Sequence, residues 1–248
     1  MASSETIFGI NAVSVRLMAG GSGVHRLLLR EGKLNARLSE IEAMAHANRI
    51  PVERIPEAEL SARTAVSHQG VGLVVNPEHY LDESVLKDLL VQGSSPALLL
   101  VLDGVTDPRN FGACLRSAAT LGVTAVIVPK DRSAPLGPAA IKTASGGASI
   151  VPVVRVVNIS RCLATLKKQG VWVVGTLLQG AQDLDTIDLK GPTAIVMGSE
   201  ESGIRRNTAD QCDFLARIPM IVDDLGFNVS VATGICLYEA QRQRRTGS

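Results

Sequence analysis

The sequence predicts an α/β protein with a small N-terminal domain and a larger C-terminal domain built on a parallel sheet. From Ala97 onward, short runs rich in Val, Ile and Leu alternate with segments of helical periodicity. Such runs are typical of strands buried on both faces of a helix-covered parallel sheet. The chain has 248 residues, of which 46% are hydrophobic and 3% aromatic, so two aliphatic cores are expected.

Residues 1–76 are expected to form the small α/β domain. Its predicted elements, in chain order, are a helix over 11–19, a strand over 24–30, a helix over 35–48 and a strand over 71–75. Residues 77–96 are interpreted as a solvated linker, because proline stands at both ends and Gly93-Ser94-Ser95 precedes the second proline. A helix is predicted within this linker, over 82–91.

Residues 97–248 are expected to form the parallel-sheet domain. The predicted strands are 98–102, 125–128, 151–156, 171–176, 194–197 and 215–218. The predicted helices are 110–121, 159–169, 204–211 and a long one over 229–244. Ligands of such sheets bind beyond the carboxyl ends of the strands, so the polar turns that follow these strands are where a site is expected.

Composition and cysteine spacing exclude several classes of protein. The formal net charge is +1, so a polyanion would bind only at a local patch, and that binding would be sensitive to salt. The four cysteines are isolated, with no Cys-x-x-Cys pair, so no metal site and no redox dithiol are indicated. The longest strongly apolar run, residues 97–102, is too short to span a bilayer, and no signal pattern is present; a cytoplasmic protein is expected.

Two common enzyme patterns are also absent from the sequence. No Gly-x-Gly-x-x-Gly motif joins a first strand to a first helix, which argues against a dinucleotide-binding Rossmann domain. No histidine follows His79. A Ser-His-Asp hydrolase housed in the C-terminal domain is therefore excluded unless the N-terminal domain supplies its base.

Three segments of the C-terminal domain lie where an apolar run gives way to a polar turn. They are residues 107–119 (DPRNFGACLRSAA), 196–203 (VMGSEESG) and 218–234 (IPMIVDDLGFNVSVATG). Together they supply amide, carboxylate, guanidinium and hydroxyl groups. That set of groups suits a site which positions two ligands for a direct transfer.

Taken one at a time, the polar residues of these segments also have purely structural explanations. Asp107 can cap a helix whose first turn holds Pro108, and Glu200 can serve the start of the next helix. Asn228 or Ser230 can cap the terminal helix. The residues by themselves therefore leave a structural and a functional interpretation open.

In this order the three segments resemble the three motifs of the SpoU/TrmH (SPOUT) family of RNA ribose 2′-O-methyltransferases. Further matches lie at residues 7–9 (IFG), 68–70 (HQG), 102–108 (LDGVTDP), 126–133 (VIVPKDRS) and 228–237 (NVSVATGICL), so the resemblance covers nearly the whole chain. It is strongest to the members that modify bacterial 23S rRNA. The resemblance implies transfer of a methyl group from S-adenosylmethionine (AdoMet) to the ribose 2′-hydroxyl of a guanosine in that RNA.

The resemblance also implies an architecture and a set of partners. The C-terminal domain would contain a deep trefoil knot, an exception to general topology rules that periodicity gives no reason to expect. The protein would be a homodimer with its active site near the subunit interface, and it would bind RNA rather than DNA or a membrane. The N-terminal domain would be the family's small RNA-binding domain, related in fold to ribosomal protein L30e.

By the same resemblance, the catalytic residues are Asn110, Arg116, Glu200 and Asn228. The cofactor pocket is expected to use loops around Gly198, Ile218 and Phe227, and no metal is expected. The role of base is often given to the arginine, but a guanidinium has no acceptor atom. We therefore expect Arg116 to clamp the neighbouring RNA phosphate and to stabilise the developing alkoxide. Glu200 and the two asparagines would orient Arg116 and the target nucleotide.

The chain departs from the family pattern beside the third motif. Gly226-Phe227-Asn228 stands where relatives usually have Ser-Leu-Asn, and the larger Phe227 can wall an adenine pocket. Two alternatives to rRNA methylation remain: a non-catalytic RNA-binding or ribosome-assembly protein on the same scaffold, and a tRNA 2′-O-methyltransferase. The candidates for phosphate contact in the N-terminal domain are Arg26, Arg30, Lys33 and Arg37, with an ordinary solvated face as the alternative.

Overall fold

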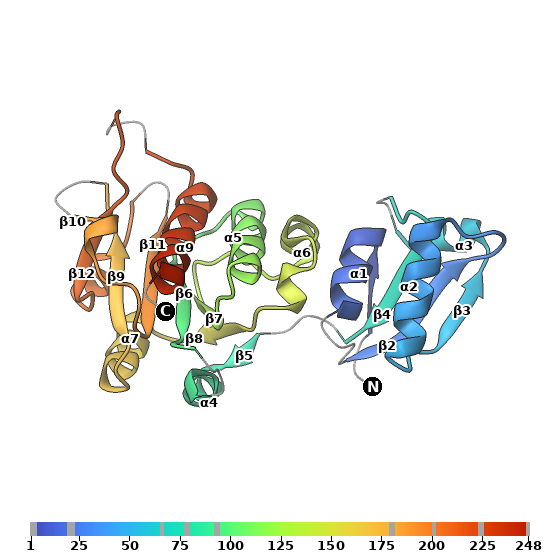
Figure 1. Ribbon diagram of the computed structural model, residues 1–248, viewed down its shortest axis with the longest axis horizontal. Helices are drawn as coiled ribbons and strands as arrows, with labels where there is room; N and C mark the ends of the chain where they lie inside the picture. The colour runs from blue at the N-terminus through green and yellow to red at the C-terminus, as the bar shows by residue number, and fades with distance from the viewer. Residues whose placement is uncertain are drawn as a thin grey trace. The chain divides into compact units, whose positions relative to one another are not determined.

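The computed structural model describes residues 4–18, 23–64, 67–76, 80–91, 95–178, 182–199, 202–222 and 226–246. The chain divides into two compact units, residues 1–78 and 79–248, and each has its own sheet and core (Figure 1). No helix in these described ranges combines the length and the apolar character needed to cross a membrane.

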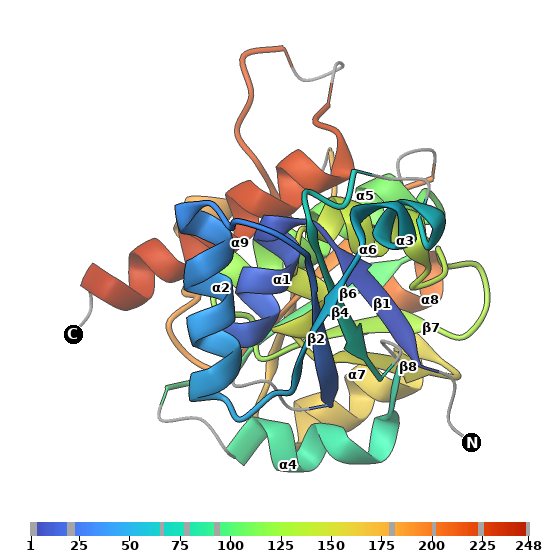
Figure 2. The ribbon, with the colours of Figure 1, turned by 90° about the vertical axis from the view of Figure 1, so that its right-hand side faces the viewer.

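Over its described residues, the first unit is a four-stranded mixed sheet with helices on both faces. Its elements are β1 (Glu5–Phe8), α1 (Ile10–Met18), β2 (Val24–Arg30), α2 (Ala36–Ala47), β3 (Val52–Ile55), α3 (Glu57–Ala62) and β4 (Val71–Val75). The strand order is β1-β4-β2-β3, with β2 and β3 parallel and the other pairs antiparallel. Leu27 and Leu29 pack against α1 and α2, which lie side by side in Figure 2, whereas Leu28 packs against α3.

The strands predicted over 24–30 and 71–75 are confirmed with the same bounds as β2 and β4, and the two predicted helices correspond to α1 and α2. Asn35 caps α2, since its Oδ1 accepts the N–H of Leu38 at 3.0 Å. Strands β1 and β3 and helix α3 were not predicted. Segments of four to six residues are too short to show a period.

Over its described residues, the second unit is an eight-stranded sheet in which every pair is parallel, in the order β10-β12-β9-β11-β6-β7-β8-β5. The strands are β5 (Leu81–Asp82), β6 (Leu98–Asp103), β7 (Ala125–Pro129), β8 (Val153–Val156), β9 (Trp172–Thr176), β10 (Gln182–Asp183), β11 (Thr193–Gly198) and β12 (Phe214–Arg217). The helices are α4 (Leu86–Val91), α5 (Pro108–Thr120), α6 (Pro138–Ala144), α7 (Ile159–Lys168), α8 (Arg206–Ala209) and α9 (Val229–Thr246), with short 3-10 turns η1 (Glu83–Val85), η2 (Gly147–Ser149) and η3 (Leu184–Thr186).

Helices cover both faces of this sheet, as its apolar strands predicted. Leu98, Leu100 and Leu102 of β6 belong to the core under α5, α6 and α9, whereas Leu99 and Val101 belong to the core over α4 and α7. Figure 1 shows these two helical layers on opposite sides of the sheet. The predicted fold class, an α/β chain with a parallel sheet, is confirmed. The trefoil knot and the L30e-like character of the first unit stay predictions.

The described residues 80–91 of the segment predicted to be a solvated linker, 77–96, contribute structure to the second unit. β5 pairs with β8, and α4 buries Leu86. The hydroxyl of Tyr80 accepts the N–H of Leu136 at 2.7 Å. The helix expected over 82–91 is present as η1 and α4. Within the segment, side chains such as Asp88 point to solvent, as in a linker, while the apolar residues between them face the core.

Candidate active site

The register of the parallel sheet brings several predicted polar turns to one edge. β6 and β11 are neighbours, and their pairing ends with Asp103 opposite Gly198. The turn after β6 leads into α5, and the turn after β11 begins with Ser199. On the other side of β11 lie β9 and β12, whose carboxyl ends lead to Leu177 and Ile218. This edge is where ligands of parallel sheets bind.

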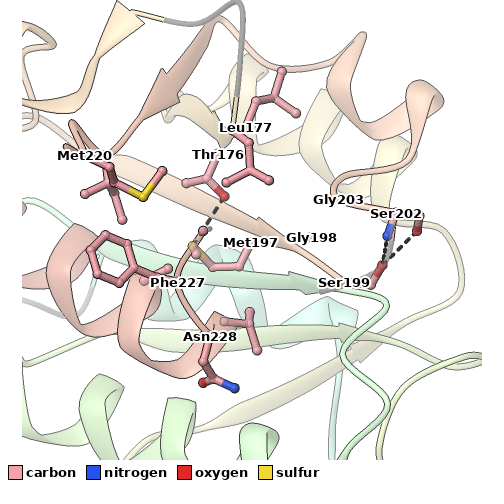
Figure 3. A pocket seen from close by; sticks show the side chains of 15 residues that line it. Thr176, Leu177, Met197, Gly198, Ser199, Ser202, Gly203, Met220, Phe227 and Asn228 are labelled. Carbon is pink, nitrogen blue, oxygen red and sulfur yellow. Dashed lines mark hydrogen bonds between the residues drawn. The ribbon is translucent and has the colours of Figure 1, made fainter. Parts of the chain in front are cut away.

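A cavity of about 570 Å³ lies at the carboxyl ends of β9, β11 and β12 and at the start of α9 (Figure 3). Its lining residues are Thr176, Leu177, Leu178, Met197, Gly198, Ser199, Ser202, Gly203, Ile218, Met220, Gly226, Phe227, Asn228, Val229 and Ala232. The lining therefore includes all three residues predicted for the cofactor pocket. In Figure 3, Met220 and Phe227 lie on one side of the cavity, and Ser199 with its 2.7 Å hydrogen bond to Ser202 lies on the other.

Glycine is required at position 198 because the floor of this cavity is a tight turn. A Cβ atom at Gly198 would lie 2.0 Å from the carbonyl carbon of Gly203 and 2.2 Å from the nitrogen of Ile204. Ser199 and Gly203 exchange two backbone hydrogen bonds of 3.0 Å each, which close the turn. Gly203 has a φ of +65°, which favours glycine there as well.

A second cavity of about 360 Å³ lies at the carboxyl ends of β6 and β7. Its lining residues are Asp103, Gly104, Val105, Thr106, Asp107, Asn110, Arg132, Ser199, Ser202, Arg205 and Val229. Ser199, Ser202 and Val229 line both cavities, so the two cavities share a boundary.

Two of the four predicted catalytic residues meet at this boundary. Nδ2 of Asn228, which lines the first cavity, donates to Oδ1 of Asn110, which lines the second, at 3.1 Å. Oδ1 of Asn228 accepts the N–H and the hydroxyl of Ser230, at 2.9 and 2.6 Å, and so caps α9. Asp107 caps α5 by accepting the N–H of Arg109 at 2.8 Å. The capping roles of Asp107 and Asn228 are confirmed, and Asn228 caps α9 through its amide oxygen.

An ion pair between the buried Asp103 and the partly exposed Arg205 joins the segment after β11 to the end of β6. Asp103 is 1% exposed, and its Oδ2 accepts the N–H of Arg205 at 3.2 Å. Its Oδ1 lies 3.4 Å from Nη1 of the same arginine. A buried carboxylate is costly unless it is paired, so losing either partner would release this segment.

Of the other two predicted catalytic residues, only Arg116 is among the residues that the structure describes. Arg116 is exposed on α5 and lines neither cavity. It follows Asn110 by six residues, which is about 240° further round a helix of 3.6 residues per turn. The two side chains therefore leave different faces of α5. Glu200 lies outside the described residues.

The cavity-lining residues that were not predicted as site residues include Arg132, Arg205 and Met220. Arg132 follows β7 and has a φ of +58°, which is uncommon for a residue other than glycine. Its loop is tied to the turn after β6, because the N–H of Ala134 donates to the carbonyl of Val105 at 2.8 Å. A signal was present, since Arg132 belongs to the VPKDRS match, but no chemistry had been assigned to it.

The candidates for RNA contact in the first unit differ in their surroundings. Nε of Arg26 lies 3.2 Å from Oε2 of Glu53. Arg30 donates to the backbone carbonyl of Lys33 at 2.9 Å. Lys33 and Arg37 are exposed. The role of these residues in RNA binding stays a prediction.

Comparison with known proteins assigns the chain to a family. Residues 97–238 match the model of the SpoU rRNA Methylase family, and residues 6–81 match the model for RNA 2′-O ribose methyltransferase substrate binding. Over 245 residues the chain is 45% identical to the 23S rRNA (guanosine-2′-O-)-methyltransferase RlmB of Pseudomonas putida, covering 99% of both chains. It is 46% identical over 244 residues to the protein of the same name from Coxiella burnetii, covering 98% of each.

Solved structures show the same relationship. The SpoU methyltransferase AviRb from Streptomyces viridochromogenes, in complex with the cofactor AdoMet, superposes with a TM-score of 0.79 at 25% identity, over 99% of this chain and 92% of that one. An AdoMet-bound rRNA methyltransferase from Sinorhizobium meliloti gives 0.75 at 26% identity, over 96% and 87%. With its parallel sheet, its two contiguous cavities and these matches over both units, the chain belongs to the SpoU rRNA methylase family.

Proposed function

We propose that the protein transfers a methyl group from AdoMet to the ribose 2′-hydroxyl of a guanosine in 23S rRNA. The observation that carries this proposal is the pair of contiguous cavities, which meet where Asn228 bonds Asn110. A direct transfer needs two ligands held in line, and each cavity can hold one of them. Relatives that are 45 and 46% identical over nearly the whole chain bear the name of this activity.

The first cavity fits AdoMet. Its volume of about 570 Å³ lies within the range of about 300–1,000 Å³ usual for small-ligand sites. Met197, Met220 and Phe227 provide apolar surface for an adenine ring, and Ser199 and Ser202 provide hydroxyls. The sulfonium of AdoMet is positively charged, and the described lining contains no lysine or arginine that would repel it. When bound, the cofactor supplies an activated methyl group.

The residues at the boundary would orient the acceptor ribose. The hydrogen bond between Asn228 and Asn110 fixes two amides between the cavities, where the sugar would lie. The 2′-hydroxyl must lose its proton, and the developing negative charge must meet a fixed donor. We assign this donor role, and the clamp on the adjacent phosphate, to Arg116. Glu200 would orient Arg116.

The proposal includes a homodimer, because Arg116 lines neither cavity of its own chain. α9 presents Val231 and Tyr238, which are 50 and 54% exposed, and α9 packs beside α5, which carries Arg116. Ile221 and Val222, in the segment that follows β12, are exposed apolar residues as well. A second copy packed on this face would cover these side chains and bring Arg116 towards the partner's cavities.

We further assign the first unit, residues 1–76, to RNA binding and residues 97–248 to cofactor binding and catalysis, in the cytoplasm. Exposed cations such as Lys33 and Arg37 suit phosphate contacts, whose strength would fall with salt. Phe8 and Tyr80 are the only aromatic residues before residue 97, so base stacking is not expected to be the main mode of RNA recognition by the first unit.

The function is tested by calorimetric titration with AdoMet, followed by mapping of ribose methylation in rRNA from a strain that lacks the gene. Cofactor binding and the loss of one 2′-O-methylguanosine from 23S rRNA are expected. Binding without a missing rRNA mark would favour a tRNA substrate, and absence of binding would favour a non-catalytic RNA-binding protein. Arg116→Ala should reduce turnover far more than cofactor affinity, and an equal loss of both would overturn the role assigned to Arg116.

A further inference from the structure

We propose that the second cavity holds the guanine base of the acceptor nucleotide and that Arg132 reads its O6/N7 edge. This inference rests on the proposed function, because it names the part of the substrate that is bound beside the transfer site. It assigns a specificity-determining role to a residue outside the three motifs.

The position of the second cavity follows from its boundary with the first. Ser199 and Val229 line both cavities, and Asn110 reaches the boundary from the second one. If the methyl donor occupies the first cavity and the ribose lies at the boundary, the base attached to that ribose extends into the second. The volume of about 360 Å³ is at the lower end of the range usual for small ligands, about 300–1,000 Å³, which suits a single base with part of its sugar.

The charge of the second cavity favours a base over a phosphate. Its lining contains two arginines, Arg132 and Arg205, and two carboxylates, Asp103 and Asp107. The buried carboxylate of Asp103 neutralises Arg205, whose N–H and Nη1 lie 3.2 and 3.4 Å from its oxygens. A phosphate would need an excess of cations in the lining, whereas a nucleobase carries no charge and needs both donors and acceptors.

Arg132 has its hydrogen-bonding groups available and its backbone fixed. The side chain is exposed, and it forms no ion pair or hydrogen bond with any residue that the structure describes. Two hydrogen bonds of 2.8 Å hold the loop. The N–H of Ala134 donates to the carbonyl of Val105, and the hydroxyl of Ser133 donates to the carbonyl of Pro129. The φ of +58° at Arg132 is a strained conformation that these contacts maintain. Because the backbone of this loop is already fixed, less conformational entropy of the loop is lost when the guanidinium binds a ligand.

The chemistry of a guanidinium selects guanine among the purines. Its two parallel N–H groups match the O6 and N7 acceptors of guanine, while adenine places an amino donor where guanine has O6. Thr106 and Asp107 add acceptors to the same lining, and these can meet the N1–H and amino group of guanine. An adenine in this cavity would leave donors facing donors, which costs binding free energy.

The test compares two transcripts of the 23S rRNA region that contains the mapped target: one with guanosine at the target position and one with adenosine. The wild-type protein should methylate the guanosine transcript with a kcat/KM about 5- to 150-fold higher. Arg132→Ala and Arg132→Lys should both remove most of this preference. Alanine has no donor, and lysine keeps the charge but lacks the two parallel N–H groups of the guanidinium. The affinity for AdoMet, measured by calorimetry, should stay unchanged. Arg161→Ala, which removes an exposed arginine on α7, is the matched control and should keep the preference.

Several outcomes would overturn the inference. An equal loss of kcat/KM on both transcripts would make Arg132 a phosphate contact, and an unchanged preference would leave it without a role in base recognition. A wild-type protein that methylates both transcripts equally would show that the cavity does not select the base. A failure of the proposed function is distinguishable, because the wild-type protein would then methylate neither transcript before any variant is compared.

Discussion

Replacement of Asn228 by aspartate should separate the stabilising role of this residue from its role in the site. The side chain uses different atoms for the two. Oδ1 accepts the N–H and hydroxyl of Ser230 at 2.9 and 2.6 Å, and Nδ2 donates to Oδ1 of Asn110 at 3.1 Å. Aspartate keeps an acceptor at the start of α9 and adds a charge that the helix dipole favours. It has no donor for Asn110.

The expected magnitudes follow from these contacts. Loss of an N-cap side chain costs about 1 kcal/mol, and a hydrogen bond contributes about 0.5–1.5 kcal/mol net. Asn228→Ala loses both, so the free energy of unfolding should fall by about 2 kcal/mol. Asn228→Asp keeps the cap and gains about 0.3–1 kcal/mol from the dipole, so its loss should stay below about 1 kcal/mol. Turnover should fall at least roughly tenfold in both variants, because the amide that aligns the acceptor is lost.

Stability is measured by thermal unfolding, where about 1 kcal/mol corresponds to a shift in Tm of roughly 2–4 °C for a unit of this size. Turnover is measured by transfer of a labelled methyl group to rRNA. The matched control is Asn158, whose Oδ1 caps α7 through the N–H of Arg161 at 2.9 Å and which lines neither cavity. Asn158→Ala should be less stable than Asn158→Asp, and both should keep wild-type turnover.

Two results would refute this reasoning. Wild-type turnover in Asn228→Asp would mean that the bond to Asn110 is not needed for alignment of the acceptor. A lower Tm for Asn228→Asp than for Asn228→Ala would mean that the oxygen at the start of α9 is not the stabilising group.

The remaining predictions concern other contacts of the second unit. Gly198→Ala should weaken AdoMet binding by about 5- to 150-fold in calorimetry, the equivalent of about 1–3 kcal/mol of overpacking, because the added methyl overlaps the backbone that follows it. Arg244→Met should lower the free energy of unfolding by about 2–3 kcal/mol in urea titrations, since this guanidinium donates to the carbonyls of four residues that precede the central strands β6 and β11. Burial raises the pKa of the Cys236 thiol from 9.0 to about 12, so alkylation of Cys236 at pH 8 should require unfolding. The free energy of unfolding should decline as the pH rises above 9.0, because the thiol then ionises in the unfolded chain and not in the folded one. Rapid labelling of Cys236 in the folded protein would contradict this. Mixing inactive Arg116→Ala and Asn228→Asp subunits should restore activity if Arg116 serves the partner's cavities, whereas no recovery would keep its action within its own chain.

The strands of the second unit could be predicted because they are buried on both faces. β6 and β7 form unbroken apolar runs in the sequence, and the six predicted strands lie within two residues of their observed bounds. α6 could not be predicted, since its seven residues consist largely of small side chains after Pro138 and show no period. β5 and β10 have two residues each. The order of the strands could not be predicted from the sequence, because the pairing of β6 with β11 depends on contacts between distant parts of the chain.

The family resemblance named the site residues, and the position of their segments after strands gave a second reason to expect a site there. Gly198 ends β11, and Ile218 and Phe227 lie between β12 and α9, so all three are at the carboxyl edge of the sheet, where the topology rule places ligands, and they line one cavity. Arg132 lies at the same edge, but nothing local distinguishes it from a solvated arginine. Its importance depends on the pairing of β6 with β7, which brings its loop beside the turn that follows β6.

The sequence alone does not show whether a polar residue caps a helix or contacts a ligand, because both roles need the same chemical groups. A turn at the carboxyl edge of a parallel sheet must start a helix, whose first N–H groups need an acceptor side chain, and a ligand at that edge meets the same side chain. Asparagine differs from aspartate or serine in that its amide can also donate two hydrogen bonds, but Asn158 shows that an asparagine cap need not line a cavity. What distinguishes Asn228 is that its nitrogen meets Asn110, in a helix 118 residues earlier in the chain. Only the folded sheet brings those two helix starts together, so the decisive signal is a contact between segments and not a property of either one.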